Sequence, residues 1–126
     1  MLCSRRMDDW YFCLEQPERD GFALAGVGTA ALVRASGPRR FADAARDCRT
    51  IAHGALFDEG PGPQAGGPVF VGGFAFAPDG GRSPEWSSLW PAQLLLPEVS
   101  IARRGAEALL TVNTMLDGDE APDAVV

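Results

Sequence analysis

The sequence contains no lysine, one histidine and one tyrosine among its 126 residues. All eleven basic residues are arginines, so no side chain can form a Schiff base or act as an amine base. The single histidine, His53, has no partner in the sequence with which to build a catalytic triad or a metal site. We therefore expect a structural or surface role for His53.

Cysteine is also scarce. Cys3, Cys13 and Cys48 are odd in number and show no close paired spacing, which predicts neither a disulfide framework nor a zinc site. Three scattered thiols are typical of a protein of the reducing cytoplasm, where we expect this one to reside.

Long apolar runs are missing, and positive charge is in deficit. Because no stretch of about 18 apolar residues is present, we expect no membrane span. Arg5-Arg6 is followed by Asp8-Asp9 instead of the apolar region that an export signal needs. We expect residues 1–8 to be disordered or a misannotated start, with Met7 as the alternative first residue. The net charge of −6 excludes nucleic-acid binding through a basic surface.

What the chain does contain is 46% hydrophobic residues, enough for one globular core. Short apolar and aromatic runs bounded by turn residues predict strands. The second and third runs meet at Gly26-Val27-Gly28, which favours a hairpin or a bend, and the last two form a pair around Arg103-Arg104-Gly105. The expected strands cover residues 10–14, 22–27, 29–35, 69–76, 92–103 and 106–115.

One amphipathic helix is expected over about residues 39–57. Ser36-Gly37-Pro38 is typical of a helix entry. Beyond this entry, apolar residues recur at intervals of three and four with charged residues between them, which puts one face on a core and the other in water. The apolar positions are Phe41, Ala45, Cys48, Ala52 and Ala55.

The order of strands, one helix, then strands predicts an α+β fold in which the helix covers an antiparallel sheet. The strand residues offer more apolar surface than one helix can cover, so a further layer is expected; they are Phe74, Phe76, Leu94 to Leu96 and Leu109-Leu110. We interpret residues 9–116 as an incomplete α+β region and 117–126 as an acidic linker.

Gly26-Val27-Gly28-Thr29-Ala30-Ala31 matches the dinucleotide fingerprint G-x-G-x-x-A. The fingerprint functions only when a helix begins at its second glycine. Too few residues separate Gly28 from Gly37-Pro38, and they include strand-favouring Thr29 and Val33. We therefore interpret this segment as a strand junction.

Three further patterns resemble sites, and each has a simpler interpretation. The acidic cluster Asp117, Asp119, Glu120 and Asp123 is interrupted by Pro122, which breaks the register of a calcium loop and favours a solvated tail. Ser87-Ser88 lacks the glycine-flanked elbow of a nucleophilic serine. Trp86 and Trp90, near Pro84 and Pro91, are expected to anchor a loop on the core. We assign no catalytic, cofactor-binding or metal-binding residue to this chain.

The order of segments resembles the opening of isochorismate synthases of the chorismate-utilising family. The similarity runs in order and with similar spacing through nearly the whole chain, although no single motif is decisive. The segments that carry it are Trp10 to Pro17, Phe22 to Gly28, Phe41 to Ala45, Val71 to Phe76, Pro97 and Leu110 to Asn113.

This resemblance implies a magnesium-dependent isomerase that adds water to one carbon of chorismate as a hydroxyl leaves another. In that family a lysine activates the water, a glutamate protonates the departing hydroxyl, and further glutamates hold the metal. All of these residues belong to the C-terminal part of the enzyme, beyond the region that matches, so none is carried over to this chain. The absence of lysine here agrees with this.

Related anthranilate synthases have a Leu-Glu-Ser stretch that helps to form a feedback pocket for an amino acid. This chain has Leu14-Glu15-Gln16 followed by Pro17, which makes regulation by tryptophan doubtful. The Glu-Gln-Pro form looks more like the menaquinone-pathway enzymes than the siderophore-pathway enzymes.

The sequence therefore predicts the N-terminal scaffold of an isochorismate synthase, inactive by itself. Its partners would be chorismate and the missing C-terminal catalytic region of the same polypeptide. Two alternatives remain open: a standalone non-catalytic binding or regulatory module, and part of an anthranilate, aminodeoxychorismate or salicylate synthase relative.

Overall fold

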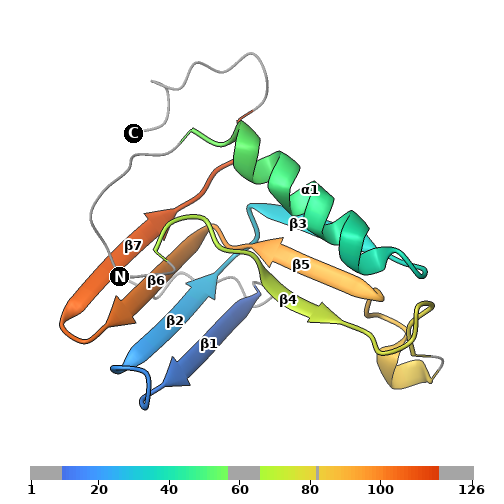
Figure 1. Cartoon of the computed structure of the whole chain (residues 1–126), viewed down its shortest axis with the longest axis horizontal. Coiled ribbons are helices and arrows are strands. Elements are labelled where there is room, and N and C mark those ends of the chain that lie inside the picture. The colour runs from blue at the N-terminus through green and yellow to red at the C-terminus, as the bar shows by residue number, and fades with distance from the viewer. Residues whose placement is uncertain (1–9, 57–65, 82, 117–126) are drawn as a thin grey trace.

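The computed structural model describes residues 10–56, 66–81 and 83–116, which form two antiparallel sheets and one α-helix (Figure 1). This arrangement confirms the predicted α+β class. The predicted start at residues 1–8 and the predicted linker at 117–126 lie outside the described residues.

The first sheet has the strand order β1-β2-β6-β7. Its strands are β1 (Tyr11–Gln16), β2 (Phe22–Val27), β6 (Val99–Arg104) and β7 (Glu107–Val112). The predicted pair around residues 103–105 is confirmed, because Arg104 faces Glu107 across the turn and Gly105 takes a φ of 55°. The inner contact of the sheet joins β2 to β6, two segments from opposite ends of the sequence.

The second sheet has the order β3-β5-β4, formed by β3 (Ala31–Ala35), β5 (Ala92–Leu96) and β4 (Val71–Phe74). Both neighbours of the central strand β5 run antiparallel to it. The predicted strand over 69–76 is thus shorter than expected, because only residues 71–74 pair with β5.

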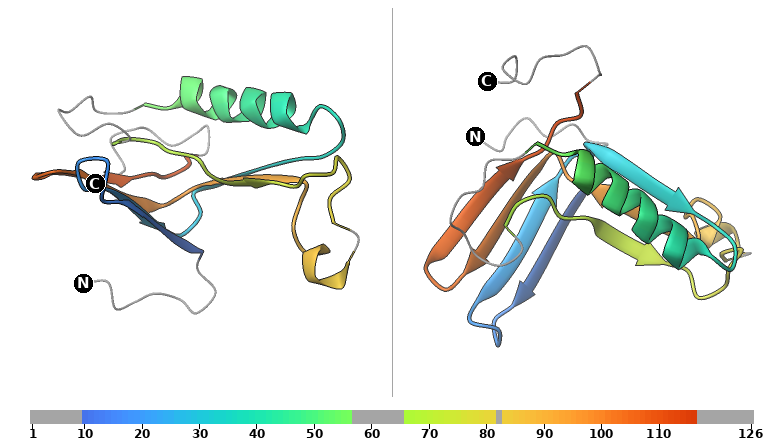
Figure 2. Two further views of the ribbon diagram at one scale, coloured as in Figure 1. Left: turned by 60° about the horizontal axis from the view of Figure 1, so that its bottom comes forward. Right: turned by 45° about the horizontal axis from the view of Figure 1, so that its top comes forward.

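Helix α1 (Arg40–Gly54) lies across one side of the second sheet (Figure 2). Its contact is built on small residues: Ala44 of the helix and Ala92 of β5 are completely buried and pack with Val33. Alanines at this contact allow the helix and strand backbones to approach closely. Cys48 packs against the same cluster, and burial raises the pKa of its thiol. The predicted helix is confirmed over Arg40–Gly54, ending before residue 57. Its predicted apolar face is wrong in part, because Phe41 and Ala52 are exposed whereas Ala44 is buried.

The predicted continuous strand over 92–103 is wrong. It is divided into β5 and β6, which belong to different sheets. Pro97 lies at the break; because proline has no N–H to donate and a fixed φ, it ends a ladder of strand hydrogen bonds. The Pro97 side chain is fully buried, and the Asn113 side-chain amide donates to its carbonyl oxygen at 2.8 Å.

The chain also passes from one sheet to the other between β2 and β3, and this second crossing lies beside the first at Pro97. Gly28, between β2 and β3, has a φ of 75°, so the junction at Gly26-Val27-Gly28 is a bend between two sheets and not a hairpin. The Ala30 N–H donates to the Leu96 carbonyl at 2.8 Å, which joins the two crossings. The dinucleotide fingerprint is followed by strand β3 and not by a helix, as its interpretation as a junction requires.

Replacing Gly28 by alanine tests this corner. We expect Gly28→Ala to lower the free energy of unfolding by about 1–2 kcal/mol, because a left-handed φ disfavours any Cβ. The added Cβ would also lie 2.5 Å from a carboxylate oxygen of Glu98 and 3.0 Å from its Cβ. Urea denaturation followed by circular dichroism measures the change. The matched control is Gly54→Ala, whose Cβ would meet nothing within 4 Å; equal effects of the two substitutions would contradict the assignment.

Candidate functional site

The face of the second sheet that turns away from α1 carries the most distinctive surface of the described chain. Side chains alternate between the two faces of a strand, and directly paired residues share a face. Val33 of β3 and Ala92 of β5 pack under the helix, so the alternate residues of each strand point to the opposite side. This opposite face carries two rows across the three strands: Arg34, Gln93 and Gly73, then Leu32, Leu95 and Val71.

The segment between β4 and β5 returns beside this face. It contains the short 3-10 helix η1 (Pro84–Trp86), which Figure 2 shows on the side of the sheet opposite α1. Segment and sheet enclose a hollow of about 640 Å³ that is open to solvent. We call it the tryptophan hollow; its main lining residues are Trp10, Phe76, Trp86, Leu89, Trp90 and Gln93.

All three tryptophans of the chain line this hollow. They lie on the surface, with 58% of Trp86 and 46% of Trp90 exposed. The prediction that Trp86 and Trp90 anchor a loop on the core is therefore wrong. Exposed aromatic side chains grouped around one depression are characteristic of a binding surface.

Two adjacent glycines form one wall of the hollow, and the lack of a side chain has a different consequence at each. Gly72 lies so close to the Gln93 carbonyl that a Cβ would collide with the β5 backbone. A Cβ on Gly73 would meet nothing within 4 Å, so this glycine leaves open space above the sheet. Gly72 thus permits the strand pairing, whereas Gly73 keeps the hollow wide.

Arg40 holds the rim of the hollow from the helix side. Only 5% of this residue is exposed, and one terminal nitrogen of its guanidinium donates to the carbonyls of Ala75 and Phe76 at 2.9 and 3.0 Å. The guanidinium also lies 4.3 Å from the centre of the Phe41 ring, which stacks on Phe74 at 4.7 Å. The first turn of α1 therefore fixes the end of β4 where the chain enters the hollow.

A second arginine, Arg34, contacts two lining residues of the hollow. The Arg34 Nε donates to the Gln93 side-chain oxygen at 3.3 Å, and the guanidinium lies 5.4 Å from the centre of the Trp90 ring. Glu85 of η1 directly precedes Trp86 in the sequence. A hydrogen bond from Ser83 lowers the pKa of Glu85, so this side chain is an anion and not a proton donor at neutral pH.

The chemistry of the hollow is that of binding. Its described lining offers indole and phenyl rings, aliphatic groups, backbone amides and the Gln93 side chain, and no acid, base or nucleophile is among these described residues. In the described ranges, no three His, Cys, Asp or Glu side chains group closely enough to hold a metal ion. The described residues therefore do not fit the magnesium ion that the resemblance implies, and we derive no reaction step from them.

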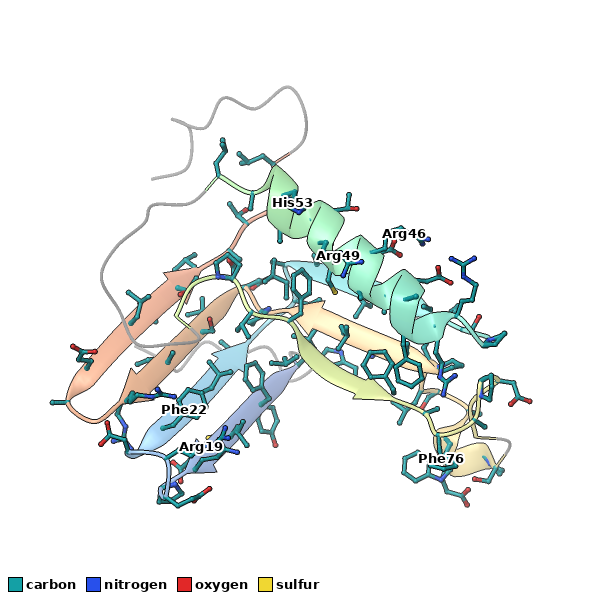
Figure 3. All side chains as sticks on the ribbon, viewed as in Figure 1. Arg19, Phe22, Arg46, Arg49, His53 and Phe76 are labelled. Carbon is teal, nitrogen blue, oxygen red and sulfur yellow. The ribbon has the colours of Figure 1, made fainter. Side chains whose placement is uncertain are left out.

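The residues considered from sequence are not brought together. His53 is exposed near the C-terminal end of α1, as expected, and Figure 3 shows it away from Phe76. The Ser87 hydroxyl donates to the Pro84 carbonyl at 2.8 Å and completes the turn of η1. The acidic cluster at residues 117–123 lies outside the described residues.

Sequence reasoning missed Trp10, Gln93 and Arg40 as members of this site. Trp10 was expected only to open a strand, and nothing in the sequence indicates that it meets residues more than seventy positions later. The usable signal was the pair Gly72-Gly73 inside a strand, since glycines there mark a close approach of backbones or a space.

Replacing Arg40 tests how the rim is held. We expect Arg40→Ala to lower the free energy of unfolding by about 2–3 kcal/mol, because two carbonyls lose a charged donor. Arg40→Lys should recover only part of this loss, since an ammonium lacks the planar fork of donors. Denaturation followed by tryptophan fluorescence measures both. Arg46→Ala is the control: Arg46 pairs with Asp43 and Asp47 on the exposed helix surface, and we expect no measurable change. An equal loss of unfolding free energy for Arg40→Ala and Arg46→Ala would contradict the role given to Arg40.

Three comparisons with known proteins bear on identity. No curated protein matches the chain, and no solved structure matches it. No helix among the described residues is long and apolar enough to cross a membrane. A family model described as "Chorismate binding enzyme" matches residues 4–126, which is nearly the whole sequence. The chain therefore belongs to the chorismate binding enzyme family.

Proposed function

We propose that this chain is the N-terminal scaffold of an isochorismate synthase and that the catalytic groups belong to a C-terminal region of the same polypeptide. The family match supports an enzyme that acts on chorismate. The choice of the isomerase rests on the resemblance of segments such as Trp10 to Pro17 and Val71 to Phe76.

The observation that carries the scaffold role is an apolar face of the first sheet that no described helix or strand covers. Strand register places two rows of side chains on this face: Tyr11, Val27, Val99 and Val112, then Cys13, Ala25, Ile101 and Leu110. We call these two rows the open face. Leu110 is 63% exposed and Val112 69% exposed. A sheet face with this composition is ordinarily covered by another layer.

The structure also corrects which residues offer apolar surface. Leu95 and Leu96 are buried, and Leu94 packs against the core under α1, so these three do not contribute as expected. Phe74, Phe76 and Leu110 are exposed. The surplus apolar surface is therefore divided between the tryptophan hollow and the open face.

In the proposed enzyme the open face packs against the catalytic region, and the reaction is the isomerisation of chorismate to isochorismate. We place the enzyme in the cytoplasm and in menaquinone biosynthesis, with siderophore biosynthesis as the alternative pathway. Magnesium would be held by carboxylates of the catalytic region. Free thiols at Cys13 and Cys48 are compatible with this compartment.

The open face predicts the behaviour of the isolated 126-residue chain. We expect it to bind 8-anilinonaphthalene-1-sulfonate strongly or to self-associate, because Leu110 and Val112 are exposed on β7, which ends the strand order of the first sheet. The double variant Leu110→Thr/Val112→Thr keeps strand-favouring residues and should lower dye fluorescence several-fold. Glu107→Gln, on the same strand, should leave it unchanged. A monodisperse monomer without dye binding would count against an uncovered layer.

Activity separates the scaffold from a complete enzyme. We expect the isolated chain to show no loss of chorismate in the presence of magnesium, measured by liquid chromatography. The reading frame is then sequenced beyond Val126 and its whole product is assayed in the same way, with isochorismate as the expected product.

Each other result selects a different conclusion. Turnover by the 126-residue chain refutes the scaffold proposal. Anthranilate, aminodeoxychorismate or salicylate as product assigns the chain to one of those relatives. A stop codon directly after Val126, followed by an unrelated gene, favours a standalone binding module.

A further inference from the structure

We infer that the tryptophan hollow binds a small planar ring that carries one carboxylate. The volume of about 640 Å³ lies within the range of about 300–1,000 Å³ that is typical of small-molecule sites. The inference does not depend on the proposed isomerase, because binding to this hollow requires no turnover.

The tryptophans that line the hollow indicate that the ligand contains a planar ring. Trp10, Trp86 and Trp90 come from two distant parts of the sequence and line one depression while remaining exposed. Indole faces stack on planar rings and gain more from this than from the same area of aliphatic contact. Gly73 leaves open space beside them, so a ring can enter without displacing a side chain.

The carboxylate is indicated by Arg34. Register places Arg34 directly opposite Gln93, on the face of the sheet that bears the hollow. The Gln93 oxygen accepts from Arg34 Nε, and the guanidinium lies over Trp90, so two contacts orient this side chain. No carboxylate among the described residues pairs with Arg34. The terminal N–H groups of its guanidinium can therefore receive an anion in the two-pronged geometry that arginine favours.

These features distinguish the hollow from the open face. The open face spans four strands and carries mostly aliphatic side chains in its two rows, as suits a packed protein layer. The hollow is bounded and aromatic, with an oriented cation at its edge. Charge complementarity therefore favours an anionic ring over a segment of polypeptide.

The test uses 4-fluorobenzoate and its neutral counterpart 4-fluorobenzamide, with binding followed by tryptophan fluorescence and by ¹⁹F NMR. We expect the carboxylate to bind more tightly than the amide and to change the fluorescence, since every tryptophan of the chain lines the hollow. Arg34→Gln should weaken 4-fluorobenzoate about tenfold, because a charged hydrogen-bond donor is lost, and leave the amide unchanged.

Gly73→Val places a branched side chain in the open space beside the tryptophans and should weaken binding of both probes strongly, with Gly73→Ala intermediate. Gly54→Ala is the matched control, since its Cβ also lies in open space but on α1. Circular dichroism verifies that each variant folds.

Three results would overturn the inference. Equal affinity of the two probes, or no effect of Arg34→Gln, would show general apolar adsorption. Unchanged binding by Gly73→Val would place the probe elsewhere. Loss of binding in the whole product of the reading frame would show that polypeptide covers the hollow.

Discussion

Burial of Pro97 at the corner between the two sheets is the constraint on which the remaining structure depends. Proline ends the hydrogen-bonding ladder of β5, and its ring packs against the β2 backbone, where a Cβ on Gly26 would lie 3.1 Å from the proline Cβ. The hydrogen bond from Ala30 to Leu96 lies directly beside this contact. The two chain crossings are therefore held together at one point, and the relative direction of the sheets is set there.

The two partly uncovered surfaces follow from this corner. Strand β5 leaves the second sheet at Leu96, so this sheet has only three strands. One face of these strands contacts α1, and the other bears the tryptophan hollow. The first sheet receives no helix among the described residues, so its open face retains exposed Leu110 and Val112. Arg40 connects the helix layer to the second sheet, since it belongs to α1 and donates to carbonyls just after β4.

The sequence was sufficient for elements whose signal is local. The existence of the helix was predictable because apolar and charged residues recur at helical spacing, and the hairpin at Gly105 because a glycine separates two alternating runs. The face that the helix buries was not, since it is centred on Ala44 and not on Phe41. The break at Pro97 was missed although proline is a local signal, because the apolar residues on both sides of it resemble one continuous strand. The hollow could not be predicted, because the meeting of Trp10 with Gln93 depends on which strands pair and in which register.

The pairing of β2 with β6 has a consequence for synthesis of the chain. Val27 pairs with Val99, 72 positions later, so the N-terminal hairpin leaves the ribosome long before its neighbour exists. During that interval the edge of β2 offers unpaired amides and carbonyls to any strand nearby. Contacts of such long range also slow the search for the native arrangement. The first hairpin of this protein is thus made early, and the β2 side of it stays adhesive until β6 has been translated.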